Sequence, residues 1–242
     1  MKPIIGVMLR SVKIGDSNAL YLSEKVRRGI IQSGGEVFTL TPPQDVNYIE
    51  TKGKDLKELT EEEKNIIEKQ LTQIDGLFIP GGSKFSEYDR YVLKKVIEKK
   101  IPTLGVCLGM QLMSCYEEEV ILENAPIEKT NHQSIDPNEK YNHLVKIQKN
   151  SKLFKIIGKE EILVNSFHSK MATNNNIYKV VATSEDKCIE AMEYPGDFFN
   201  IGVQWHPEFM VKYDENAKKL MEYFVNEAKL NKIKEKLLTN IK

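Results

Sequence analysis

The sequence lacks a surplus of charge, a long apolar run and a set of paired cysteines. Its 242 residues carry 35 basic and 35 acidic side chains. Because no basic surplus is left to neutralise a phosphate backbone or an anionic membrane, we expect no nucleic-acid partner and no membrane partner. No apolar run approaches the roughly 20 residues that a membrane span needs. Residues 1–9 are apolar only briefly and no small-residue cleavage site follows, so we expect neither a signal peptide nor an anchor.

The cysteine content is also low. Cys107, Cys115 and Cys188 are too few and too scattered for a disulfide framework or a closed zinc site. The simplest interpretation is a reduced, cytoplasmic protein. Hydrophobic residues make up 40% of the chain, which is enough to build a packed core and excludes a disordered chain.

The first half of the chain alternates short apolar runs with amphipathic stretches. The apolar runs are rich in β-branched residues, as in buried parallel strands. Thr60 precedes three glutamates and predicts a helix N-cap. Strands are predicted at residues 3–9, 37–40, 77–80 and 103–106, and helices at about 22–34, 60–74 and 87–99. This alternation indicates an α/β fold with a mostly parallel central sheet flanked by helices.

The second half is richer in strands and poorer in helices. Short strands are predicted near residues 144–147, 162–164, 177–182, 188–192 and 200–203. They favour a strand-rich insertion or an extension of the sheet. No proline- or glycine-rich linker and no repeat divides the chain, so we predict a single domain over residues 1–242.

A helix is predicted from about Asp214, with about 230–242 as a C-terminal helical extension. Leu230, Ile233 and Leu237 continue its apolar stripe, and lysines lie between them. The simpler interpretation is a helix that lies on its own domain with a solvated basic face. Docking on a partner chain is the alternative, which leaves a homo-oligomer open.

A candidate nucleophile lies where the fourth predicted strand ends. The sequence Gly-Val-Cys-Leu-Gly at residues 105–109 is the nucleophile-elbow pattern with Cys107 at its apex. Flanking glycines relieve the crowding of a tight strand-to-helix turn, and a helix N-terminus favours a thiolate. The amide of Leu108 would be suited to stabilise an oxyanion. The alternative is a buried structural cysteine, which is also the interpretation for Cys115 and Cys188.

A cysteine nucleophile needs a base, and the sequence has four histidines. His206 directly follows an apolar strand, and Glu208, two residues later, can hold its tautomer and stabilise its charge. His168 also follows a strand and is a second candidate for the base or for the pocket wall. His132 and His143 stand in polar segments, so we expect them to be surface or loop residues.

Several motifs, in order along nearly the whole chain, carry a resemblance to a known family. They are Pro3-Ile4-Ile5-Gly6, Asp75-Gly76-Leu77-Phe78-Ile79-Pro80-Gly81-Gly82, Gly105-Val106-Cys107-Leu108-Gly109-Met110-Gln111, Val164-Asn165-Ser166-Phe167-His168 and Gly202-Val203-Gln204-Trp205-His206-Pro207-Glu208. With them the chain resembles the class I glutamine amidotransferase superfamily, which has a flavodoxin-like fold. Within it the chain looks most like the peptidase C26 group of the gamma-glutamyl-gamma-aminobutyrate hydrolase type.

The resemblance implies roles for particular residues. Cys107 would be the nucleophile, His206 the general base and acid, and Glu208 the residue that orients His206. The backbone amides of Gly82 and Leu108 would form the oxyanion hole. The groups implied to hold the amino-acid end of a gamma-glutamyl substrate are Gln111 and the backbone around His168 and Ser169.

The implied activity is hydrolysis of a small-molecule gamma-glutamyl amide through a glutamyl thioester. A glutaminase subunit that supplies ammonia to a separate synthetase partner is the alternative, and an inactive binding or regulatory domain is a third hypothesis. The thiol, imidazole and backbone amides would supply the chemistry, so we expect no metal and no organic cofactor.

Two features depart from the family pattern. Only residues 83–88 separate Gly82 from Asp89, so part of the usual pocket wall is missing or reshaped. Lys170 stands where the family often has glutamine. Near a pocket mouth it would favour a substrate with an extra carboxylate, and a solvent-facing lysine is the equal alternative.

Overall fold

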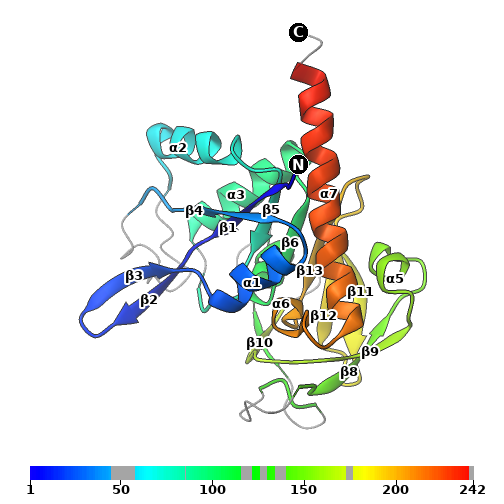
Figure 1. Cartoon of the computed structure of the whole chain (residues 1–242). Helices are drawn as coiled ribbons and strands as arrows, with labels where there is room; N and C mark the ends of the chain where they lie inside the picture. Colours follow the sequence, from blue (N-terminus) through cyan, green and yellow to red (C-terminus); the bar gives the residue numbers. More distant parts are fainter. Residues whose placement is uncertain are drawn as a thin grey trace.

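The structure of the protein is a computed structural model (Figure 1). It describes residues 1–44, 58–84, 86–115, 122–125, 130–133, 140–172 and 177–239. Within these ranges nine strands form one sheet in the order β4-β1-β5-β6-β13-β12-β11-β8-β9. The chain therefore has the α/β architecture that the sequence predicts.

The parallel half of the sheet is built from the predicted apolar runs. Its strands are β4 (Glu36–Leu40), β1 (Ile4–Met8), β5 (Gly76–Ile79), β6 (Thr103–Val106) and β13 (Asn200–Val203). The pairing of β6 with β13 sets Val106 beside Val203. Residues that follow these two strands therefore emerge next to each other at the carboxyl edge of the sheet, where open α/β sheets bind ligands.

The antiparallel half extends the same sheet. It consists of β12 (Ile189–Glu193), β11 (Lys179–Ser184), β8 (His143–Ile147) and β9 (Glu161–Val164). The predicted strand-rich second half is thus an extension of the central sheet rather than a separate insertion. Strand β11 lies two residues later than predicted.

Helices cover both faces of the sheet and enclose two apolar cores. One face carries α1 (Glu24–Gln32), α5 (Lys152–Ile157), α6 (Pro207–Met210) and α7 (Glu215–Thr239). The other carries α2 (Glu61–Leu71), α3 (Glu87–Glu98) and α4 (Leu108–Ser114). Helix α2 starts at the predicted cap, because the Thr60 hydroxyl accepts from the Glu63 amide and the Glu63 carboxylate accepts from the Thr60 amide.

Sequence reasoning did not predict the hairpin of β2 (Arg10–Ile14) and β3 (Ser17–Tyr21). Its residues are mostly exposed, so no apolar alternation marks the strands. The helices α5 and α6 are short and were also missed, as were the two-residue strands β7 (Glu123–Asn124) and β10 (Lys170–Met171). The hairpin matters most, because its end reaches the candidate site.

The first part of α7 packs on the sheet, and its last turns rise above the rest of the molecule in Figure 1. Lys232 binds the carboxylate of Asp75 and the carbonyl of Lys2, while Leu230, Ile233 and Leu237 are about half exposed. Residues 240–242 of the predicted extension lie outside the described residues. Among the helices that the structure describes, none combines the length and the apolar character needed to cross a bilayer.

Candidate active site

Cys107 occupies the predicted turn between β6 and α4. Its backbone has φ 52° and ψ −106°, a strained conformation for a residue with a side chain. The flanking glycines permit the turn: a Cβ on Gly109 would lie 2.3 Å from the carbonyl oxygen of Ile79, and one on Gly105 would lie 2.9 Å from the carbonyl carbon of Gly109. Close packing of backbone on backbone therefore requires glycine on both sides of Cys107.

His206 follows β13 and meets Cys107 across the sheet edge. Its Nδ1 lies 2.8 Å from Oε1 of Glu208, and both side chains are buried. Burial lowers the pKa of His206, but the charge of Glu208 and hydrogen bonds to Cys107 and Glu208 outweigh it and raise the pKa to about 10. The ring is therefore cationic at pH 7, and an imidazolium beside a thiol stabilises the thiolate form.

Asn165, at the end of β9, holds the backbone of His206 from both sides. Its Nδ2 donates to the His206 carbonyl at 3.0 Å, and its Oδ1 accepts from the His206 amide at 2.8 Å. The ring of His206 stacks on Phe209 and meets Phe167 edge-on, with centroids 4.7 and 5.6 Å apart. Sequence analysis gave Asn165 no role, although it belongs to one of the motifs that carry the resemblance.

Arg10 holds the strand end that faces the cysteine. Its Nε and a terminal nitrogen donate to the carbonyl of Pro80 at 3.2 and 3.0 Å, and the other terminal nitrogen forms a buried ion pair with Asp89. Asp89 also caps α3 by accepting from the amide and hydroxyl of Ser86. Next to Pro80, a Cβ on Gly81 would lie 2.9 Å from Cε1 of His206, so the loop runs directly against the imidazole.

A cavity of about 320 Å³ opens above these groups. Its lining includes Cys107, His206, Glu208, Gly82 and Arg10, together with Tyr21, Leu22, Ser23, Val26, Pro80, Gly81, Phe167 and Phe209. Tyr21 ends the hairpin, and Leu22 and Ser23 connect it to α1, so this segment supplies a wall beside the short segment after Gly82. The volume suits a small molecule.

The three residues predicted to bind substrate are not among the residues that line the cavity, whereas the three catalytic candidates are. Gln111 is buried and its Nε2 donates to the Lys170 carbonyl at 2.8 Å. His168 is buried and its Nδ1 lies 2.9 Å from the same carbonyl oxygen, while Ser169 is exposed. Phe167, rather than its neighbour His168, lines the cavity. The side chain of Lys170 is exposed and its ammonium binds the side chain of Asn124 at 2.6 Å.

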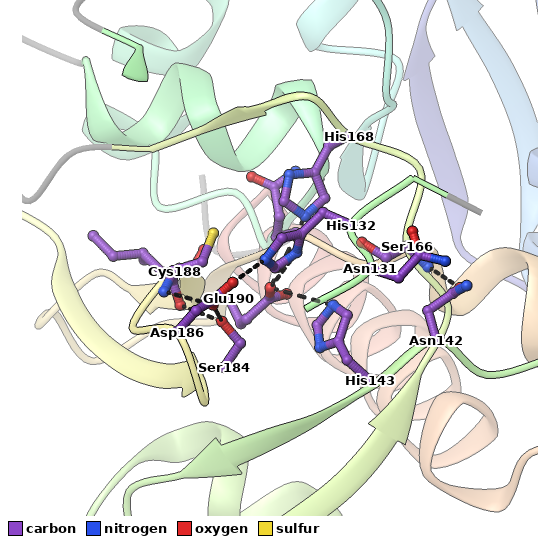
Figure 2. Close-up of polar contacts among 12 residues, drawn as sticks. Asn131, His132, Asn142, His143, Ser166, His168, Ser184, Asp186, Cys188 and Glu190 are labelled. Carbon is purple, nitrogen blue, oxygen red and sulfur yellow. Dashed lines mark hydrogen bonds and ion pairs between the residues drawn. The ribbon is translucent and has the colours of Figure 1, made fainter. Parts of the chain in front are cut away.

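His132 and His143 are expected to be surface or loop residues, and the surface part of this expectation is wrong: His132 lies in a loop and His143 begins β8, but both are buried. They are only 3% and 8% exposed, and they gather with His168 around the buried carboxylate of Glu190 (Figure 2). Burial lowers the pKa of His143 to about 4 and that of His168 to about 3, so both rings are neutral at pH 7. The polar neighbours of His132 and His143 in the sequence do not indicate this burial, because the groups that cover the two histidines come from distant segments of the chain. Burial, with the charges of Asp186 and Cys107, raises the pKa of Glu190 well above its usual range.

A family model matches the part of the chain that holds most of these residues. The family model for Peptidase C26 matches residues 84–208, a range that includes Cys107, His206 and Glu208. The chain belongs to the Peptidase C26 family. Its fold is that of the class I glutamine amidotransferases, as the resemblance implies.

The chain is also similar to named proteins, and it shares its fold with solved structures. A Rickettsia prowazekii protein, named as glutamine amidotransferase-like, is 30% identical over an alignment that covers 60% of this chain and 74% of that protein. A CTP synthase of Thermotoga maritima is 28% identical over 65% of this chain but only 36% of its own length. The structure of a GMP synthase component from Thermoplasma acidophilum shares the fold, with a TM-score of 0.64 at 16% identity and 98% coverage of both chains.

Proposed function

We propose that this member of the Peptidase C26 family is a cysteine-dependent hydrolase that cleaves the gamma-glutamyl amide bond of a small gamma-glutamyl compound. The observation that carries the proposal is that Cys107, His206 and Glu208 are buried and hydrogen-bonded in this order, and that all three line a cavity at the carboxyl edge of the sheet. A thiol, a cationic imidazole and an orienting carboxylate in this order are the parts of nucleophilic acyl transfer.

In the proposed reaction the thiolate of Cys107 attacks the gamma-carbonyl carbon and a tetrahedral oxyanion forms. The backbone amides of Gly82 and Leu108 stabilise that oxyanion. The imidazolium of His206 donates its proton to the departing amine, the C–N bond breaks, and a glutamyl thioester remains on Cys107. Water then gives a proton to His206 and attacks the thioester, which releases glutamate and restores the thiolate–imidazolium pair.

The substrate's amino-acid end is assigned to the segment of residues 168–170. Gln111 supports this assignment, because it lies on α4, the helix that follows Cys107, and its side-chain amide donates to the Lys170 carbonyl. In this arrangement Gln111 and His168 position backbone, and Ser169 is the residue free to approach the ligand. The ammonium of Lys170 is bound to Asn124, which favours the solvent-facing interpretation of that lysine.

Glutamate release from a panel of gamma-glutamyl compounds tests the proposal. The panel contains glutamine, gamma-glutamyl-aminobutyrate, gamma-glutamyl dipeptides and poly-gamma-glutamate, and Cys107→Ala is the control. Fast release from a member other than glutamine, lost in Cys107→Ala, is expected. Full activity of Cys107→Ala would reject Cys107 as the nucleophile.

A second function has a specific observation in its favour. The chain aligns with about a third of the length of a CTP synthase and shares its fold with the Thermoplasma acidophilum GMP synthase component. A glutaminase subunit would therefore fit the same site, with ammonia passing to a separate synthetase. It predicts slow glutamine hydrolysis by the chain alone, a strong rise with the synthetase, and no cleavage of the other panel members.

A further inference from the structure

A second set of chemistry-bearing side chains lies buried outside the cavity lining. His132, His168, Cys188 and Glu190 are each at most 4% exposed, and one ligand atom from each lies within 4.8 Å of all the others. They come from separate segments: residues 130–133, the stretch after β9, and the start of β12 (Figure 2). The proposed hydrolysis uses none of these four as an acid, base or nucleophile.

Hydrogen bonds fix which nitrogen of each ring carries the proton. The Nε2 of His132 lies 2.9 Å from the carboxylate of Asp186, and the Nδ1 of His168 lies 2.9 Å from the Lys170 carbonyl oxygen. An oxygen acceptor requires a protonated nitrogen, so in the neutral rings Nδ1 of His132 and Nε2 of His168 each present a lone pair. Ligating histidines are oriented in this way by a carboxylate or a backbone carbonyl.

Both lone pairs face the Glu190 carboxylate. Nδ1 of His132 and Nε2 of His168 lie 3.6 and 3.9 Å from Oε1 of Glu190, too far for hydrogen bonds. Among the described residues these two nitrogens and both Glu190 oxygens have no hydrogen-bond partner. Acceptors that converge in a buried interior are costly unless a proton or a metal cation lies between them, and these two nitrogen-to-oxygen distances are too long for a hydrogen bond through a proton.

The spacing suits a metal ion. Ligand atoms about 2.0–2.3 Å from a tetrahedral zinc lie roughly 3.3–3.8 Å from one another. Of the two nitrogen-to-oxygen distances, 3.6 Å lies within this range and 3.9 Å lies just above it. A pair of ligand atoms at the 4.8 Å limit of the whole set, Cys188 included, would have to approach by about 1–1.5 Å. Two imidazoles, a thiolate and a carboxylate form a donor set typical of zinc.

We propose that His132, His168, Cys188 and Glu190 bind one divalent transition-metal ion, of which zinc is the best match. His143 is not a ligand in this proposal. It approaches Glu190 from the side away from Cys188 in Figure 2 and is outside the set whose ligand atoms are mutually close. Asp186, which holds His132, is a positioning residue for the site.

The site would brace the wall of the cavity. It joins the 130–133 segment to His168, next to Phe167, which lines the cavity. The Glu190 carbonyl accepts from the Gln204 amide at 2.8 Å, two residues before His206. A bound ion would therefore stabilise the surroundings of the three catalytic candidates without touching the reacting atoms.

Metal binding by the full chain tests this directly. The purified protein is stripped with a chelator and titrated with Zn²⁺, with bound metal measured by mass spectrometry, and Co²⁺ is added in parallel. We expect one ion per chain, a raised melting temperature and a cobalt–thiolate charge-transfer band. A folded wild-type chain that binds neither ion would overturn the proposal, as would a water molecule in the cluster of a crystal grown with Zn²⁺.

Variants assign the ligands. Glu190→Gln and His168→Asn should lose the ion, Cys188→Ser should lose the cobalt–thiolate band, and Asp186→Asn should weaken binding by about 10- to 100-fold. The matched controls Glu193→Gln, Cys115→Ser and His143→Asn should bind as the wild type does. A thiolate band that persists in Cys188→Ser would overturn the assignment of that ligand. If a ligand variant does not fold, the wild-type titration still decides.

The same titration of Cys107→Ala separates this proposal from the proposed function, because metal binding does not need the nucleophile.

Discussion

Replacing Asn165 with alanine should disable the site at a distance from the reacting atoms. The Asn165 side chain is 2% exposed and makes two hydrogen bonds, at 3.0 and 2.8 Å, to the carbonyl and amide of His206. Without it the His206 amide stays buried and unpaired, at a cost of about 1–3 kcal/mol, whereas the His206 carbonyl loses one bond but still accepts from the Phe209 amide at 3.2 Å. Together the unpaired amide and the one lost bond to the carbonyl should lower the free energy of unfolding by about 2–4 kcal/mol.

The same change should slow catalysis more than it destabilises the fold. Domains of this kind have about 5–15 kcal/mol of stability, so Asn165→Ala should remain folded. A displacement of the imidazole by about 1 Å is enough to cost roughly 100-fold in rate. Urea denaturation followed by circular dichroism measures the first effect. Glutamate release, and alkylation of Cys107 by iodoacetamide, measure the second.

The controls separate the two hydrogen bonds from a general loss of packing. Asn165→Asp keeps an acceptor for the His206 amide but places a carboxylate oxygen against its carbonyl, so it should also be impaired. Asn231→Ala loses a single bond, to the Asp75 carbonyl, and should lose about 1 kcal/mol with an unchanged rate. Wild-type stability and rate in Asn165→Ala would refute the reasoning.

Three further predictions follow from the site. Because the pKa of His206 is raised from 6.5 to about 10 in the folded protein, its contribution to stability is fully present below pH 6.5 and is lost as the pH rises through about 10. The free energy of unfolding measured across this window should fall accordingly, and His206→Gln should make it less dependent on pH. Gly109→Ala should destabilise the fold by at least about 1–3 kcal/mol, because its Cβ would lie 2.3 Å from the Ile79 oxygen. Gly158→Ala, which has open space around its Cβ, should lose only about 1 kcal/mol, and thermal melting measures both variants. Arg10→Met should lose about 3–5 kcal/mol of stability, because it leaves Asp89 buried without its ion-pair partner. Adding Asp89→Asn should restore part of the lost stability, and equal stability of the single and the double variant would contradict this prediction.

Local patterns were enough to predict the strands of the parallel half and the position of Cys107. Buried parallel strands are continuous apolar runs, and a Gly-x-Cys-x-Gly turn after one of them is a short-range signal. The register of β6 against β13 then brings His206 to Cys107, although the two lie about 100 positions apart. The proximity of Cys107 and His206 therefore results from the pairing of their two strands, which their spacing in the sequence does not show.

Long-range polar contacts were beyond sequence reasoning. Arg10 meets Asp89 across 79 positions and Asn165 meets His206 across 41, and neither pair leaves a periodic pattern. His132 was misjudged for the same reason, because its polar neighbours in sequence are unrelated to Asp186 and Glu190, which bury it. The exposed β2–β3 hairpin was missed because no apolar alternation marks its strands.

The central claim is that Cys107 carries the glutamyl group during turnover. Its most direct test is an acid quench during turnover of the best substrate in the panel, followed by mass spectrometry of the peptide that contains Cys107. We predict a glutamyl thioester on Cys107 of the wild-type chain, formed within one turnover, and neither adduct nor turnover in Cys107→Ala. Turnover by Cys107→Ala, or a glutamyl adduct on another residue, would contradict the account.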